Sequence, residues 1–246
     1  PVMKACWSIT KRELAGFFAS PIAPVFIMIF LLMAGFFTFL VGGFLARGEA
    51  TLTVLFFWLP WLFLFLVPAV GMRMWAEERR MGTLEWLLTM PVSPWQPIVG
   101  KFLASWLVVA LALALTFPFV ITVNYLGDPD NGVILAGYLG SWFLAGAYLA
   151  VTSFTSALTR NQVVSFILAV AICLFLVLSG WPPVTGFLSH FVGRGVVEFV
   201  AALSVMTHFE AIQRGVLDTG DAVYFVSVIA LGLLGTAFVL KVHRAG

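Results

Sequence analysis

The chain has 246 residues, of which 62% are hydrophobic and 10% are charged, and its mean hydropathy is +1.08. Soluble domains are typically about half apolar and about a quarter charged, so the composition excludes a water-soluble globular enzyme. Thirteen Lys and Arg residues against eleven Asp and Glu give a formal net charge of +2, which excludes the strongly basic surface of a nucleic-acid-binding protein. The composition therefore predicts an all-α integral membrane protein.

Six apolar stretches reach the roughly 20 residues that a helix needs to cross about 30 Å of hydrocarbon. We expect transmembrane helices at residues 23–45, 52–74, 98–123, 133–157, 163–181 and 222–241. Lys and Arg residues are retained on the cytoplasmic side of a membrane. With a cytoplasmic N-terminus, ten of them fall in inner segments and three in outer segments. This asymmetry predicts that the N- and C-termini are both cytoplasmic.

Two segments outside these stretches have a mixed polar and apolar character. Residues 3–19 place basic residues among aromatic and aliphatic ones, which is typical of a helix lying in the membrane interface. Residues 182–221 are too apolar for a free loop, but polar residues interrupt them too often for a seventh crossing. They are expected to form re-entrant or interfacial helices on the outer side. A gate or partner-binding surface and a plain interfacial cap are both open interpretations.

Catalytic and ion-coupling motifs are missing from the sequence. Gly100-Lys101 is not a P-loop, because Trp95 occupies the position of the first glycine and Phe102 follows the lysine. None of the six expected spans carries Asp, Glu, Lys, Arg or His near its midpoint, which disfavours proton-coupled transport. The three histidines do not cluster with Cys, Asp or Glu at metal-ligand spacing. We therefore expect no catalytic, cofactor-binding or metal-binding residue in this chain.

The most charged connection between spans runs through residues 73–93, RMWAEERRMGTLEWLLTMPVS. The charges at 77–80 predict that the second span ends at about Trp75. Gly82 permits a sharp break, and Thr83 can cap a short helix whose leucines form one apolar face. Composition leaves two interpretations open, an interfacial loop that obeys the positive-inside rule and a docking element for a soluble partner.

Three segments carry a resemblance to a known family. EERRMGTLEWLLTMPVS resembles the stretch after the second span of ABC-2 type permeases, in which Glu-Glu, Gly-Thr, Leu-Glu, Leu-Leu and Pro recur in this order. Two further segments are similar to parts of the gliding-motility and nitrous-oxide-reductase-maturation permeases within that family. One resembles the start of those proteins, KRELAGFFASPIAPVFIMIF, and the other resembles the segment that leads into their last span, HFEAIQRGVLDTGDAVYFVSV. The three segments bracket nearly the whole chain in the right order.

The resemblance implies a single transmembrane domain, residues 1–246, in the bacterial cytoplasmic (inner) membrane. The chain would be the non-catalytic permease subunit of an ABC transporter and would pair with a second copy or a close paralogue. It would bind two copies of an ABC ATPase subunit, which holds the ATP and Mg. A periplasmic accessory protein is a further expected partner. The alternative function is a membrane anchor or mechanotransmission scaffold that uses the same ATPase without transport.

The resemblance also assigns three sets of residues. The coupling helix region, 77–91, contains the expected ATPase contacts Glu77, Glu78, Arg79, Arg80, Gly82, Thr83, Glu85 and Leu87. The N-terminal elbow helix contributes Trp7, Lys11, Arg12 and Glu13. An outer gate is expected at Phe187, Phe191, Phe199, His208 and Glu210. In this mechanism ATP closes the ATPase dimer, the coupling helix moves, and the stiff second span transmits the motion.

Small residues and prolines within the spans leave their roles open. Gly137, Ser141 and Ala145 lie on one face of the fourth span, where small residues let another helix approach closely. Internal packing and a seam between two copies both fit this pattern. Prolines in the second and third spans, Pro118 among them, would either bend these helices around a cavity or be tolerated kinks without function.

Overall fold

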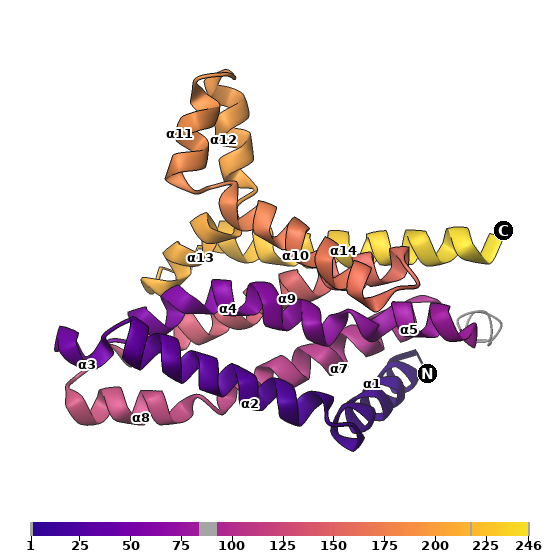
Figure 1. The fold of residues 1–246 in the computed structure, drawn as a ribbon, viewed down its shortest axis with the longest axis horizontal. Helices are drawn as coiled ribbons and strands as arrows, with labels where there is room; N and C mark the ends of the chain where they lie inside the picture. The colour runs from indigo at the N-terminus through magenta and orange to yellow at the C-terminus, as the bar shows by residue number, and fades with distance from the viewer. Residues whose placement is uncertain (1, 84–92, 217, 246) are drawn as a thin grey trace.

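The computed structural model describes residues 2–83, 93–216 and 218–245, and every regular element in these ranges is a helix (Figure 1). The first half contains α1 (Val2–Ala19), α2 (Ile22–Gly35), the π-helix η1 (Phe36–Val41), α3 (Phe44–Arg47), α4 (Thr53–Gly71) and α5 (Arg73–Met81). The second half contains α7 (Trp95–Ala114), α8 (Phe117–Leu126), α9 (Asn131–Leu158), α10 (Gln162–Leu178), α11 (Pro182–Ser189), α12 (Arg194–Ala202), α13 (Val205–Gln213) and α14 (Thr219–Ala245). The all-α architecture is thus confirmed for the described residues.

The long helices run along the long axis of the molecule (Figure 1). Five helical stretches of the described chain are long and apolar enough to cross a membrane: Ile22–Arg47, Thr53–Met81, Trp95–Leu126, Asn131–Leu158 and Thr219–Val242. Two bent pairs, α10 with α11 (74°) and α12 with α13 (60°), raise the number of candidate crossings to seven if each pair is one span. The chain is a multi-pass membrane protein with five to seven candidate crossings, and the expected fifth span corresponds to α10.

Helix α9 is the centre of the bundle, packed by α4, α5, α7, α10, α13 and α14. Because lipid is as apolar as the side chains, membrane helices associate by close van der Waals contact between small residues. Gly137 is such a residue, since a Cβ there would overlap the ring of Phe56 on α4. Ser141 and Ala145, on the same face, are fully buried within this chain. The internal-packing interpretation of this row is therefore confirmed.

The third expected span is broken near Pro118. α7 ends at Ala114 and α8 begins at Phe117, so the proline stands in the first turn of a new helix, where its missing N–H has no helical partner to lose. The hydroxyl of Thr116, between the two helices, lies 2.7 Å from that of Tyr138 on α9. By contrast, α4 remains helical through Pro60 and Pro68.

The second expected span corresponds to α4, and the helical path continues beyond the expected end of that span at about Trp75. After a one-residue interruption at Met72, α5 continues the helical path to Met81. The Trp75 side chain is fully buried. Glu78 and Arg79 need no aqueous loop here, because other helices of the chain supply their polar partners.

The segment after α10 forms three short helices, as the composition of residues 182–221 suggested. α11 and α12 form a hairpin that projects from the side of the bundle (Figure 1), and neither helix has a buried residue. α13 packs back against α9 and α14. α1 and the ends of α5 and α14 lie together at one end of the molecule (Figure 1).

Candidate functional site

The junction between α4 and α5 is held by a serine from the central helix. The Ser156 hydroxyl on α9 donates to the Met72 carbonyl at 2.8 Å. Its oxygen accepts from the backbone N–H groups of Trp75 and Ala76, each at 3.0 Å. The first N–H groups of a helix have no partner within the helix, so Ser156 caps α5 from outside. The direction of α5 is thereby fixed relative to α9.

A second serine on α9 extends this contact to the last helix. The indole Nε1 of Trp75 donates to the Ser153 hydroxyl at 3.1 Å. The Thr236 hydroxyl on α14 lies 3.2 Å from the same oxygen. One buried polar contact thus joins α5, α9 and α14. We call Ser153, Ser156, Trp75 and Thr236 the hydroxyl clasp.

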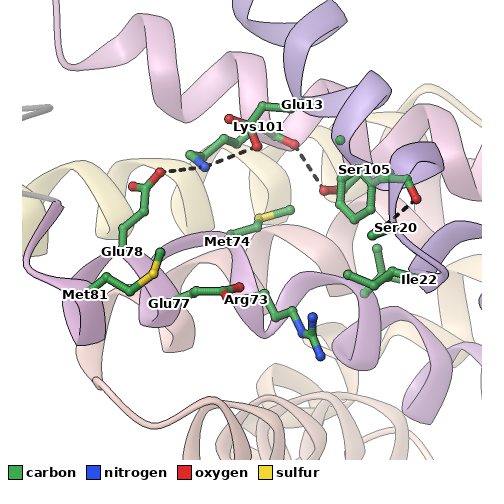
Figure 2. Close-up of a pocket in the computed structure, with 13 residues that line it drawn as sticks. Glu13, Ser20, Ile22, Arg73, Met74, Glu77, Glu78, Met81, Lys101 and Ser105 are labelled. Atoms are coloured by element: carbon green, nitrogen blue, oxygen red, sulfur yellow. Dashed lines mark hydrogen bonds and ion pairs between the residues drawn. The ribbon is translucent and has the colours of Figure 1, made fainter.

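Lys101 on α7 is the charged centre of the end of the molecule where α1 and the end of α5 lie. Its Nζ lies 2.9 Å from Oε1 of Glu78 on α5 and 3.3 Å from Oε2 of Glu13 on α1, as Figure 2 shows. The same nitrogen lies 5.6 Å from the centre of the Trp75 ring, within the range of a cation–π interaction. Three helices from distant parts of the sequence therefore meet at one ammonium group.

The charges around Lys101 balance. Its side chain is only 9% exposed, and burying a lone ammonium costs several kcal/mol. The carboxylates of Glu78 and Glu13 offset that cost, and Arg12 lies 3.2 Å from Glu13 on its exposed side. Two positive and two negative groups thus form a neutral cluster, which we call the Lys101 cluster (Arg12, Glu13, Glu78 and Lys101).

A cavity of about 260 Å³ borders this cluster. Figure 2 shows Glu78, Glu77 and Arg73 of α5 on one side of it and Lys101 with Glu13 on the other. Phe17, Met74 and Met81 contribute apolar wall. Within the described residues, no group of three His, Cys, Asp or Glu side chains is placed to hold a metal ion. The arrangement is suited to mechanical connection between helices.

The expected coupling residues divide between inward and outward positions. Glu78 points to Lys101, and the Arg79 guanidinium donates to the Ala157 carbonyl at the end of α9. Arg80 is exposed, and Glu77 lies at the cavity.

The break after α5 lies at the expected glycine. Gly82 has φ +71°, which a residue with a side chain adopts only with strain, and it ends α5. The Thr83 hydroxyl turns back toward the Glu78 carbonyl at 3.4 Å. Glu85, Leu87 and the rest of the expected short helix lie outside the described residues.

The expected interfacial helix 3–19 corresponds to α1. It packs on α7, where a Cβ at Gly100 would lie 2.8 Å from Ile9. Trp7 is exposed, and the Lys11 ammonium lies 5.5 Å from its ring centre. Arg12 is exposed, while Glu13 faces inward to Lys101.

The five residues of the expected outer gate fall into two separate groups. Phe187, Phe191 and Phe199 are mostly exposed on the projecting hairpin. His208 and Glu210 lie on α13. The His208 Nδ1 is 2.6 Å from the Asp221 carboxylate, whereas Glu210 lies 3.5 Å from Arg214. The described structure does not bring the three phenylalanines to the α13 pair.

Sequence reasoning missed the role of Lys101 and of the two serines. The available signal for Lys101 was that it is a lone charge, six residues after the start of an otherwise apolar helix. A charged side chain buried at such a position needs a polar or charged partner. Ser153 and Ser156 carried no comparable signal, because serine is common in membrane helices as a packing residue.

A family model described as ABC-2 family transporter protein matches residues 49–240, a range that begins after α3 and includes α5, Lys101 and the hydroxyl clasp. No curated protein matches the chain. Since the matched range covers well over half of the sequence, the chain belongs to the ABC-2 family of transporter membrane proteins.

Proposed function

We propose that the chain moves a substrate across or out of the membrane, as the permease of a complex in which a separate ABC ATPase hydrolyses ATP. Family membership makes it a multi-pass permease subunit with such an ATPase as partner. The finer features are part of the proposal: six spans, two permease copies, two ATPase copies and cytoplasmic termini. The segments at 11–30 and 208–228 support placement in the gliding-motility and nitrous-oxide-reductase-maturation subgroup.

The hydroxyl clasp is the observation that carries this proposal. The expected coupling region, 77–91, begins on α5, and α5 is tied to α9 by Ser156 and to Ser153 through Trp75. A rigid helix fixed at its base must move with the element that displaces its end. A displacement of the coupling region would therefore reach α9, the helix at the centre of the bundle.

The motion has a continuous path to the opposite end of the molecule. α9 packs on α13, where a Cβ at Gly140 would lie 2.6 Å from Ile212. α13 is in turn joined to α14 by His208 and Asp221. ATP-driven closure of the ATPase dimer would thus shift the outer helices through α9, and substrate would pass while they are displaced.

One observation favours the alternative function of a mechanotransmission scaffold. The α11–α12 hairpin projects from the bundle with Phe187, Phe191 and Phe199 exposed (Figure 1). Such a hairpin suits contact with lipid, a second permease copy or another membrane protein. In a scaffold, ATP hydrolysis would move that partner, and no substrate would cross the membrane.

Two glycines with matching geometry test the docking role. Gly82 has φ +71° and Gly48 has φ +64°, and a Cβ at either position meets nothing within 4 Å. Valine at each site imposes similar backbone strain, since β-branched residues avoid this conformation, but only Gly82 lies at the coupling region.

The complex of permease and ATPase is purified in nanodiscs, and ATP hydrolysis and co-purification are measured. Gly82→Val should reduce both by about tenfold, in the usual range of coupling energies, whereas Gly48→Val should leave both near wild type. Equal behaviour of the two variants would contradict docking through the coupling region. Movement of a partner without transport, in vesicles carrying the complex, would favour the scaffold.

A further inference from the structure

We propose that Lys101 joins the elbow helix α1 and the coupling end of α5 into a single rigid docking unit, so that the ATPase displaces both helices together. The inference rests on the proposed function and assigns a positioning role to a residue on a third helix. Lys101 itself need not touch the ATPase.

The packing of the bundle explains why such a joint is needed. In the described chain, α1 packs mainly on α7 and α2, whereas α5 packs mainly on α9 and α10. The two helices that lead to the cytoplasmic surface therefore belong to different neighbourhoods of the bundle. Lys101 makes ion pairs to both of them, at 3.3 Å to Glu13 and 2.9 Å to Glu78.

Because of the neighbouring cavity, the distance between α1 and α5 depends more strongly on the ion pairs of Lys101. Its space of about 260 Å³ is bordered by Gly16 and Phe17 of α1 and by Met74 and Met81 of α5. Side chains do not fill that space, so packing alone does not set the separation of α1 and α5 there. The separation depends on the salt bridges that cross beside the cavity (Figure 2).

The burial of Lys101 makes the joint stiff. Charge pairs strengthen as the surroundings become less polar, and the side chains of Lys101, Glu78 and Glu13 are 9%, 20% and 24% exposed. If the carboxylate of Glu78 or of Glu13 moved away, the buried Lys101 ammonium would lose part of the negative charge that offsets its burial. The Trp75 ring, held by Ser153, limits the path of the ammonium on the α5 side.

The test measures the distance between α1 and α5 by double electron–electron resonance. Spin labels are attached at Ser8→Cys on α1 and Met81→Cys on α5, both exposed positions, after Cys6→Ser and Cys173→Ala remove the native thiols. The wild-type background is compared with Lys101→Met, Lys101→Arg and Lys241→Met. Lys241 is an exposed lysine on α14 and serves as the matched control.

We expect one narrow distance in the wild-type permease, the same without nucleotide and in the ATP-bound complex. Lys101→Met should widen the distribution and lower permease-stimulated ATP hydrolysis by about tenfold, as a lost coupling of usual size would. Lys101→Arg keeps the charge and should restore the narrow distance. Lys241→Met should behave as wild type in both measurements.

Two results would contradict the proposal that Lys101 joins α1 and α5. One is a Lys101→Met distribution as narrow as that of the wild type, and the other is a wild-type distance that changes on ATP binding. The width comparison uses the permease alone, so it decides the inference even if the ATPase fails to bind. Failure of the wild-type chain to bind or stimulate any ABC ATPase would instead contradict the proposed function.

Discussion

The imidazole of His208 is bonded on both sides, with Nδ1 2.6 Å from the Asp221 carboxylate and Nε2 3.3 Å from the Ala202 carbonyl. Both neighbours are hydrogen-bond acceptors. The ring also stacks on Tyr224, with 4.0 Å between centroids. The Tyr224 hydroxyl donates to the Leu203 carbonyl at 2.6 Å. The end of α12 and the start of α13 are therefore fastened to α14 at the end of the molecule opposite the Lys101 cluster.

Asp221→Asn should loosen that fastening, because a neutral amide oxygen is a weaker hydrogen-bond acceptor for His208 than a carboxylate. A hydrogen bond with a charged partner contributes about 1.5–3 kcal/mol, so residues 194–213 should exchange their amide hydrogens faster. Hydrogen–deuterium exchange with mass spectrometry measures the effect. Asp218→Asn is the control, since the Asp218 carboxylate bonds locally to Thr219 and Gly220. Equal exchange in the two variants would count against the fastening.

Ser156→Ala should destabilise the junction between α4 and α5. The N–H groups of Trp75 and Ala76 would lose their buried acceptor, which costs about 1–3 kcal/mol. The midpoint of thermal unfolding in detergent should fall accordingly. Ser189→Ala removes an exposed hydroxyl that donates to the Gly186 carbonyl of its own helix, and it should change stability by less than about 0.5 kcal/mol. A Ser156→Ala protein as stable as Ser189→Ala would exclude the capping role.

Substitutions in the Lys101 cluster should affect the stability of the permease and its coupling to ATP hydrolysis differently. Lys101→Met leaves two partly buried carboxylates without their cation, and removal of one partner of a buried pair costs about 3–5 kcal/mol. Lys101→Met combined with Glu13→Gln and Glu78→Gln removes the charges together and should recover most of that loss. Permease-stimulated ATP hydrolysis should remain low in the triple variant. Recovery of hydrolysis along with stability would show that the cluster acts only on folding.

Gly232 tests the contact between α9 and α14. A Cβ at this position would lie 2.7 Å from the carbonyl carbon and oxygen of Ala150, which are backbone atoms and cannot rotate away. Gly232→Ala should therefore force the two helices apart and cost about 1–3 kcal/mol. Gly35→Ala on α2 meets nothing within 4 Å and should be neutral or stabilising, because alanine favours a helix more than glycine does. Thermal unfolding of both variants in detergent checks the difference.

The features that depend on local composition could be predicted from the sequence. The membrane class, the expected interfacial helix at 3–19 and the break at Gly82 each follow from a short run of residues whose chemistry limits the backbone. The same holds for the helical character of residues 182–221 and the interruption near Pro118. These are consequences of apolar length, glycine and proline, and none requires knowledge of a distant neighbour.

The sequence was a weaker guide to the rotation of each helix about its own axis. In a soluble protein the polar face of a helix marks the side that meets water. Here most faces are apolar, so the sequence pattern did not mark Trp75 as the fully buried side chain that the structure shows. For the same reason, the row containing Gly137 fitted both an internal contact and a seam between two copies.

By itself, the sequence determined that this chain is an apolar bundle of membrane helices and that its densest run of charges lies within residues 73–85. Only the tertiary structure decided which charges meet, since Glu13, Glu78 and Lys101 come from three separate helices. The physical reason is that the place of each helix along the chain follows from the length and composition of its segment. An ion pair depends instead on how neighbouring helices are rotated and shifted against one another. That arrangement is set by contacts such as Ser156 with the start of α5, across 81 residues of sequence.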